Sequence, residues 1–112
     1  MESCVFCKIA KREIDTQLAY EDEKFIAFKD INPQAPVHII ICPKDHIEKI
    51  DSINGKVKIW EALFSIANIM IKKFELDKTG YKIVNNGAGY NHLEHEHIHV
   101  LGGKGYKPPC DP

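Results

Sequence analysis

The chain has 112 residues, the length of one domain, and its 44% hydrophobic and 28% charged residues exclude general disorder. Fifteen Lys and Arg stand against sixteen Asp and Glu, so no basic excess indicates a nucleic-acid partner. The longest apolar stretches, such as residues 37–42, fall far short of the ~20 residues of a membrane helix. No signal peptide opens the chain, and we expect a cytoplasmic protein with no membrane or nucleic-acid partner.

The first half of the chain predicts a short helix, a hairpin and a buried strand. Apolar residues recur at helical spacing over 5–14, with Ser3 as the expected N-cap. Two apolar segments, 18–20 and 25–28, flank an acidic turn and predict a hairpin. Residues 37–42 form a nearly continuous β-branched run, typical of a central strand covered on both faces, which Pro43 ends. We interpret Cys42, inside that run, as a small core residue.

The second half predicts a long helix and two more strands. A helix is expected over 56–74, capped by Ser52 or Asn54, with a core-facing stripe of Trp60, Leu63, Phe64, Ala67, Met70, Ile71 and Phe74. Strands are expected over 80–84 and about 94–101. From about residue 104 the tail is irregular, and Cys110 within it is interpreted as a spare thiol. Strands that cluster before and after the long helix predict one α+β domain over 1–112. It would have an antiparallel sheet of about five strands, one long helix and a short N-terminal helix.

Three histidines alternate strictly near the end of the chain, as His95, His97 and His99. On a strand they would share one face, about 6.5–7 Å from one to the next. Imidazole can act as nucleophile, general acid or base, and metal ligand near neutral pH. A polar, solvent-facing strand is the alternative, but Ile98, Val100 and Leu101 favour a core strand with one functional face.

Several segments carry a family resemblance. Residues 95–104 resemble the histidine-triad signature H-φ-H-φ-H-φ-φ, in which φ is apolar. Residues 30–36 with His38, and 43–47, resemble the central block of that family; 4–9 resemble the start of its Hint-like members, and 80–82 with 85–87 the strand before the triad. The chain therefore resembles the histidine-triad (HIT) family over about residues 4–106, in the branch with a zinc-binding Cys-x-x-Cys pair.

The resemblance implies a nucleotide-binding hydrolase that acts at the α-phosphate of purine nucleoside phosphoramidates. His97 would attack phosphorus and form a nucleotidyl-histidine intermediate, and water would then release the nucleoside monophosphate. His99 would contact the phosphate or the bridging atom and help to protonate the leaving amine. The alternatives are a dinucleoside polyphosphate hydrolase or nucleotidyltransferase, a zinc-containing nucleotide-binding module with weak catalysis, and a redox or metal-buffering protein.

The resemblance also implies a nucleotide site. Asp30 would hold the ribose hydroxyls, and Asn85 would face the phosphate or ribose. The base pocket would be lined by Val5, Phe6, Ile9 and Ile31. A turn aspartate, a turn asparagine and core residues are the respective alternatives. Residues 89–94 depart from the family pattern, where Asn91 or His92 would replace its phosphate donors.

Cys4 and Cys7 have metal-ligand spacing, and the thioredoxin-like context that a redox pair needs is absent. The resemblance implies that His46 and His95 complete a structural Zn²⁺ site with them, closed by four protein ligands. The alternative is two reduced cysteines and no metal. The resemblance places His38 under the active site as a buried, hydrogen-bonded support.

Glu96 stands where the family pattern has an apolar residue, and Glu94 precedes it on the same face. A buried carboxylate needs a partner, so either the start of the strand is exposed or these residues meet a Lys, an Arg or a neighbouring subunit. The resemblance also implies a homodimer in which the long helix and the sheet edge meet across a two-fold axis.

Overall fold

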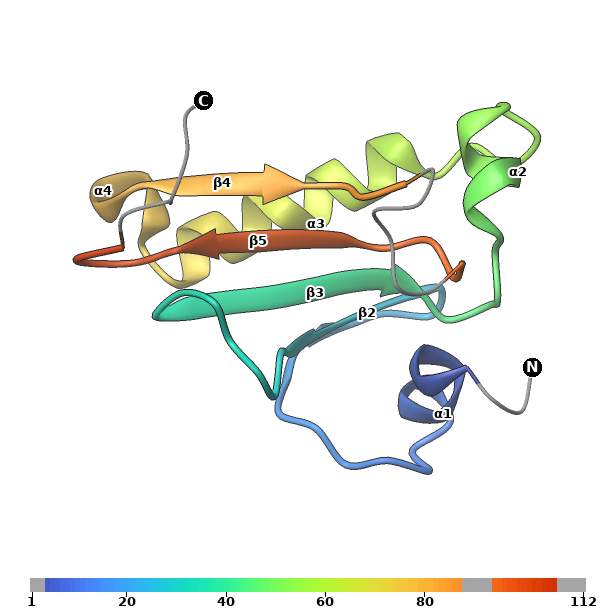
Figure 1. The fold of residues 1–112 in the computed structure, drawn as a ribbon, viewed down its shortest axis with the longest axis horizontal. Helices are drawn as coiled ribbons and strands as arrows, with labels where there is room; N and C mark the ends of the chain where they lie inside the picture. The colour runs from blue at the N-terminus through green and yellow to red at the C-terminus, as the bar shows by residue number, and fades with distance from the viewer. Residues whose placement is uncertain (1–3, 88–93, 107–112) are drawn as a thin grey trace.

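The computed structural model describes residues 4–87 and 94–106. An antiparallel sheet of five strands has the order β1-β2-β3-β5-β4 (Figure 1). Its strands are β1 (Leu18–Glu21), β2 (Phe25–Lys29), β3 (Val37–Pro43), β4 (Tyr81–Val84) and β5 (Ile98–Gly102). The helices are α1 (Val5–Ala10), α2 (Lys49–Ile53), α3 (Trp60–Lys73) and α4 (Leu76–Thr79). The prediction of an α+β fold with an antiparallel sheet is confirmed.

The central strand β3 is covered on both faces, as its continuous apolar run predicts. Ile39 and Ile41 belong to the core on the α3 side of the sheet. Ile40 and Cys42 belong to a second, smaller core that α1 covers (Figure 1). The sheet therefore separates two layers, and residues of β3 alternate between them. Cys42 is fully buried and is a core residue, as predicted.

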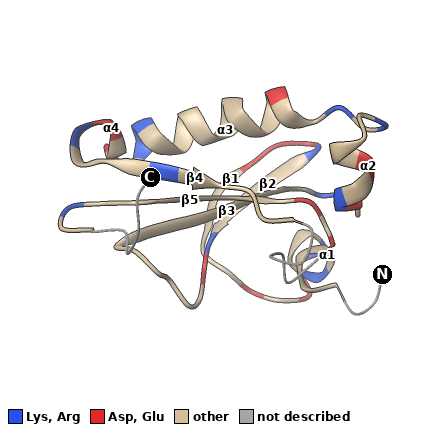
Figure 2. Ribbon diagram, turned by 45° about the horizontal axis from the view of Figure 1, so that its top comes forward, with Lys and Arg blue, Asp and Glu red and all other residues tan. Residues whose placement is uncertain are grey.

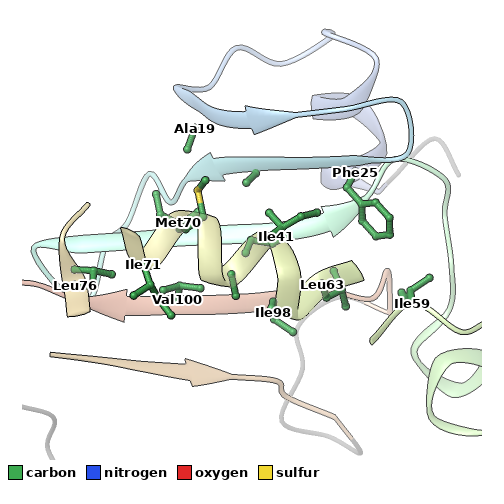
Figure 3. Packing of buried hydrophobic residues seen from close by; sticks show 14 residues of the cluster. Ala19, Phe25, Ile41, Ile59, Leu63, Met70, Ile71, Leu76, Ile98 and Val100 are labelled. Atoms are coloured by element: carbon green, nitrogen blue, oxygen red, sulfur yellow. The ribbon is translucent and has the colours of Figure 1, made fainter. Parts of the chain in front are cut away.

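The core on the α3 side is built mainly from one helix stripe against two strands. Leu63, Ala67 and Met70 are 0% exposed. Figure 3 shows that Leu63 and Met70 point from α3 toward the sheet, where Ile41 and Val100 face them. Glu61 lies in the first turn of α3 and basic residues in the last (Figure 2), an arrangement that suits the helix dipole.

The predicted start of the long helix and one of its core positions are wrong. The helix begins at Trp60, and its N-cap, Ile59, makes no side-chain hydrogen bond. Ser52 is buried inside the short helix α2, and Asn54 is the C-cap of that helix. The backbone N–H groups of Lys56 and Val57 donate back to the carbonyl oxygen of Asp51 in α2, so these residues belong to the turn after α2 and the long helix starts beyond them. Phe64, at the edge of the stripe, is 48% exposed.

The other differences lie at the ends of elements. Helix α1 ends at Ala10, not at residue 14, because Arg12 has a φ of 65° that turns the chain. The last strand begins at Ile98, not at residue 94, because its ladder with β3 stops near Pro43, which has no N–H to donate. Helix α4 was not predicted. The N-cap of α1 is Cys4 and not Ser3, so that prediction is wrong. Cys110 lies outside the described residues.

Among the described residues, no helix reaches the length and apolar character that crossing a bilayer requires.

Candidate functional site

The alternating histidines lie where the segment before β5 enters the strand, on the face that α1 covers. The rings of His97 and His99 have centroids 5.1 Å apart. Phe6 of α1 contacts His97 with a centroid distance of 4.8 Å and His95 with 5.7 Å, both edge-to-face. His97 is buried, and His99 is half-buried.

The proton of the His97 ring is held by a backbone carbonyl. Nδ1–H of His97 donates a hydrogen bond of 2.9 Å to the carbonyl oxygen of His95. A neutral imidazole carries one ring proton, so this bond assigns the basic lone pair of His97 to Nε2. His97 also lines a largely apolar cavity beside α1, with a volume of about 390 Å³. The ring is therefore oriented as a nucleophile would need to be.

A second chain of hydrogen bonds orients His99. The N–H of Gln34 donates to Nδ1 of His38 at 3.1 Å, so the His38 proton lies on Nε2. That Nε2–H donates to Nδ1 of His99 at 2.8 Å, which leaves the ring proton of His99 on its own Nε2. Burial lowers the pKa of His38, and the carboxylate of Asp30, 3.4 Å from Nε2, opposes this shift. His38 is thus a buried, neutral support for His99.

The cavity contains most of the expected nucleotide-site residues. Its walls include the expected nucleotide-binding residues Val5, Phe6, Ile9, Asp30 and Ile31, and the expected catalytic residues His97 and His99. The lining residues that were not predicted are Ile14, Thr16, Phe28, Lys29, Asn32, Ile40 and Asn86. The wall is therefore largely apolar near α1 and polar near Asp30. Asn91 and His92 lie outside the described residues.

Asp30 has a structural bond as well as a place on the cavity wall. One carboxylate oxygen accepts the N–H of Asn32 at 2.8 Å, the bond of a turn aspartate. Ile31, beside it, is 80% exposed, as a residue at the rim of a site would be. The turn role and a ligand role of Asp30 are therefore compatible, because a carboxylate accepts several hydrogen bonds.

Asn85 faces away from the cavity wall that its neighbour Asn86 forms. Its Nδ2 donates to Oε1 of Glu96 and to the carbonyl oxygen of His97, both at 2.9 Å. Asn86, and not Asn85, lies on the cavity wall. The structure therefore brings Asn85 to the backbone of His97.

Glu96 forms a buried ion pair with Lys49 of α2. The carboxylate lies 3.1 and 3.2 Å from Nζ of Lys49, and the side chains are 1% and 9% exposed. Oε1 of Glu96 also accepts the backbone N–H of His97 at 2.9 Å. Glu94, in contrast, is exposed. Of the two expected outcomes, exposure therefore applies to Glu94 and pairing with a Lys to Glu96.

Cys4, Cys7, His46 and His95 meet at the N-terminus of α1 and form a group that could hold a metal ion. Sγ of Cys4 lies 3.3 Å from Nδ1 of His95, and Sγ of Cys7 lies 3.3 and 3.5 Å from Nδ1 of His46 and His95. Sulfur and nitrogen ligands of a tetrahedral zinc ion are about 3.5 Å apart, from bond lengths of about 2.3 and 2.0 Å. The four side chains fit zinc.

The remaining ring nitrogens of the metal cluster (Cys4, Cys7, His46, His95) are also satisfied. Nε2–H of His95 donates to the carbonyl oxygen of Pro43 at 2.7 Å, which leaves Nδ1 as the ligand atom. Burial lowers the pKa of His95 and keeps the ring neutral, as a metal ligand must be. Burial and the neighbouring thiol of Cys4 raise the pKa of Cys7, so a metal would have to displace that proton.

Comparison with known proteins identifies the family. A family model described as HIT domain matches residues 11–106. The chain belongs to the HIT family. The resemblance of the sequence to histidine-triad proteins is thereby confirmed.

Relatives of this HIT chain carry names that bear on the site. A 14 kDa zinc-binding protein of Zea mays is 41% identical over 109 residues, which cover 89% of this chain and 81% of that protein. A HIT family hydrolase from Clostridium thermocellum is 41% identical, with a TM-score of 0.82 and 96% of each chain covered. A histidine triad nucleotide-binding protein from Candida albicans is 29% identical, with a TM-score of 0.78 and 98% and 85% of the two chains covered.

Proposed function

We propose that this HIT protein hydrolyses purine nucleoside phosphoramidates at the α-phosphate through a nucleotidyl intermediate on His97. The observation that carries the proposal is the orientation of His97. Its Nδ1–H is held by the His95 carbonyl, and its ring lies on the wall of a cavity large enough for a nucleoside. The similarity to a named HIT family hydrolase and to a named nucleotide-binding protein supports the same reaction class.

In the first step Nε2 of His97 attacks phosphorus, a phosphorus–nitrogen bond to the imidazole forms, and the bond to the amine breaks. The amine leaves with a proton taken from solvent, and His99 would assist that transfer through the Nε2–H that its bond from His38 keeps on that atom. In the second step water attacks phosphorus and the bond to His97 breaks. The proton that water loses goes to solvent, and the nucleoside monophosphate leaves. Two easier displacements replace one difficult displacement.

Nucleotide recognition follows from the two ends of the cavity. The apolar end, which Val5, Phe6 and Ile9 line, suits a purine base. Asp30, at the polar end, retains acceptor capacity beyond its bond to Asn32 and would accept the ribose hydroxyls. The distance from a base in the apolar end to His97 is then bridged by the ribose and the α-phosphate.

We propose that the metal cluster holds Zn²⁺ through all four of its side chains. A closed set of four protein ligands stabilises a fold and supplies no open position for water. The ion would join α1 to the segment before β5 and so fix the wall that Phe6 contributes beside His97. The Sγ to Nδ1 distances and the similarity to a named zinc-binding protein support this assignment.

The proposal extends to a homodimer and to a cytoplasmic location. The β4 edge of the sheet, with Tyr81 51% exposed, and the exposed Phe64 of α3 are surfaces that a second copy could cover. The thiols of Cys4, Cys7 and Cys42 are free, and a reducing compartment keeps them so.

The test is hydrolysis of a fluorogenic adenosine phosphoramidate by the native protein and by His97→Ala. We expect release of AMP and amine by the native protein, and a loss of at least about 10³-fold in the variant, as the removal of a nucleophile gives. A stoichiometric AMP adduct, trapped by acid-free quenching and mapped to His97 by mass spectrometry, would identify the intermediate.

Two other results would point to the alternatives. Faster cleavage of diadenosine polyphosphates than of the phosphoramidate would make the protein a dinucleoside polyphosphate hydrolase. AMP binding with no turnover of either substrate would make it a zinc-containing nucleotide-binding module.

A further inference from the structure

Glu48 joins both histidines of the metal cluster. Its Oε2 accepts the Nε2–H of His46 at 2.5 Å. Its backbone pairs with His95 as an isolated antiparallel bridge. One residue therefore contacts the ring of one histidine ligand and the main chain of the other.

The bond to Glu48 decides which nitrogen of His46 faces the cysteines. With the ring proton on Nε2, the lone pair lies on Nδ1, which is 3.3 Å from Sγ of Cys7. His95 reaches the same tautomer through the Pro43 carbonyl. A carboxylate acceptor makes an imidazole a stronger metal ligand than a solvated ring, and loss of such a partner typically lowers metal affinity 10–100-fold.

We propose that Glu48 is a positioning residue of the metal site, which orients His46 and raises the affinity of the cluster for zinc. This inference rests on the zinc assignment made in the proposed function and goes beyond it, because Glu48 is not itself a ligand. The carboxylate and His46 would form a charge-assisted pair behind the ion.

A purely local structural role does not explain the side chain of Glu48. The residue is the N-cap of α2, but its side chain makes no capping hydrogen bond. Within the described part of the chain, the carboxylate has no hydrogen-bond partner other than His46. Removal of the Glu48 side chain therefore takes no capping hydrogen bond from α2, and the His46 N–H is the one described donor that loses its acceptor.

The experiment is competition for zinc between the full-length protein and a chromogenic chelator of known affinity. Glu48→Ala is expected to raise the zinc Kd 10–100-fold. Glu48→Gln keeps an oxygen that accepts the His46 N–H but loses the charge, so a smaller increase is expected. Asp45→Asn is the matched control, because it removes an equal charge from an exposed position next to His46. Its zinc Kd should stay within about twofold of the native value.

A second readout follows the ring rather than the affinity. Nitrogen NMR of zinc-loaded native protein should show the His46 proton on Nε2, and Glu48→Ala should change the shift of that nitrogen while the His95 signals stay in place. A Kd for Glu48→Ala within twofold of native, or an equal shift for Asp45→Asn, would overturn the proposal.

The outcomes separate this inference from the assignments beneath it. If the native protein binds one zinc per chain and Glu48→Ala binds it equally tightly, only the role of Glu48 is lost. If the native protein binds no zinc, both the zinc assignment and the proposed role of Glu48 are refuted. Phosphoramidate hydrolysis is measured independently, so its failure leaves the zinc result interpretable.

Discussion

Replacement of Glu96 by valine tests how the buried ion pair contributes to stability. The substitution leaves the ammonium of Lys49, 9% exposed as a side chain, without its carboxylate. Asn85 Oδ1 and the face of the Trp60 ring, 5.3 Å from Nζ, are then its remaining contacts. Breaking a buried pair by removing one partner costs about 3–5 kcal/mol, and loss of the hydrogen bond from the His97 N–H to Oε1 of Glu96 adds about 1 kcal/mol.

We therefore expect Glu96→Val to lose about 4–6 kcal/mol of unfolding free energy, measured by urea denaturation with the m-value as a check on two-state behaviour. The double variant Lys49→Met/Glu96→Val removes both charges. It should recover most of the loss and lie within about 1–2 kcal/mol of native, because a well-packed apolar pair replaces a buried ion pair at little cost.

The double variant also supplies the refutation. A loss below about 1 kcal/mol in Glu96→Val would mean that the ion pair is effectively solvated. A double variant as unstable as the single one would assign the cost to the His97 N–H and to packing instead. The coupling energy from the complete cycle, including Lys49→Met, separates these explanations.

Three further predictions concern other parts of the molecule. Asp30→Asn should raise the KM of a ribonucleoside phosphoramidate about tenfold, since one charge-assisted bond is lost, but hardly that of the 2′,3′-dideoxy analogue, in steady-state assays. The pKa of His38 is lowered in the folded state, so as the pH falls below 6.5 the unfolded chain takes up the His38 proton before the folded chain does. The unfolding free energy, measured by urea titration at each pH, should therefore fall from pH 7 toward pH 5, and it should fall less steeply in His38→Gln. Gly102→Ala places a Cβ 2.3 Å from the carbonyl oxygen of Gly80, and we expect a loss of about 1–3 kcal/mol in the same assay, whereas an unchanged value would show that β4 shifts freely.

The fold could be predicted because its main elements carry strong periodic patterns. The apolar run of β3 fits only a strand that is covered on both faces of the sheet. The apolar stripe of α3 fits only a helix that packs against one of those faces. Helix α2 has 5 residues, too few for a periodic signal, and it was missed. The start of the long helix was placed too early because Asn54 was interpreted as a possible N-cap of that helix. Asn54 is instead the C-cap of α2, and the glycine after it, Gly55, has a φ of 77°, as is common where a helix ends.

The site was predictable in its residue types and less so in its register. Spacing singles out Cys4 and Cys7, alternation singles out the three histidines, and the family resemblance adds His46 to the metal cluster. None of these shows which of Asn85 and Asn86 faces the cavity. Both asparagines follow the end of β4, where the alternation of a strand no longer fixes the direction of a side chain. Likewise, the need of Glu96 for a partner is evident from its position, but its partner Lys49 lies 47 positions away and only the packed fold identifies it. Glu48 had no sequence signal at all.

The four side chains of the metal cluster come from distant parts of the chain. Cys7 and His46 are 39 positions apart, and Cys4 and His95 are 91 positions apart. During synthesis the two cysteines emerge first, and as a local pair they offer a passing ion only two thiolates. The fourth ligand emerges when nearly the whole sheet has been made, so the full set of ligands cannot close before β3 and the segment ahead of β5 have found each other. An ion bound by all four side chains would therefore stabilise only a chain that has already completed its longest-range contacts. It would not stabilise a stalled or misfolded chain.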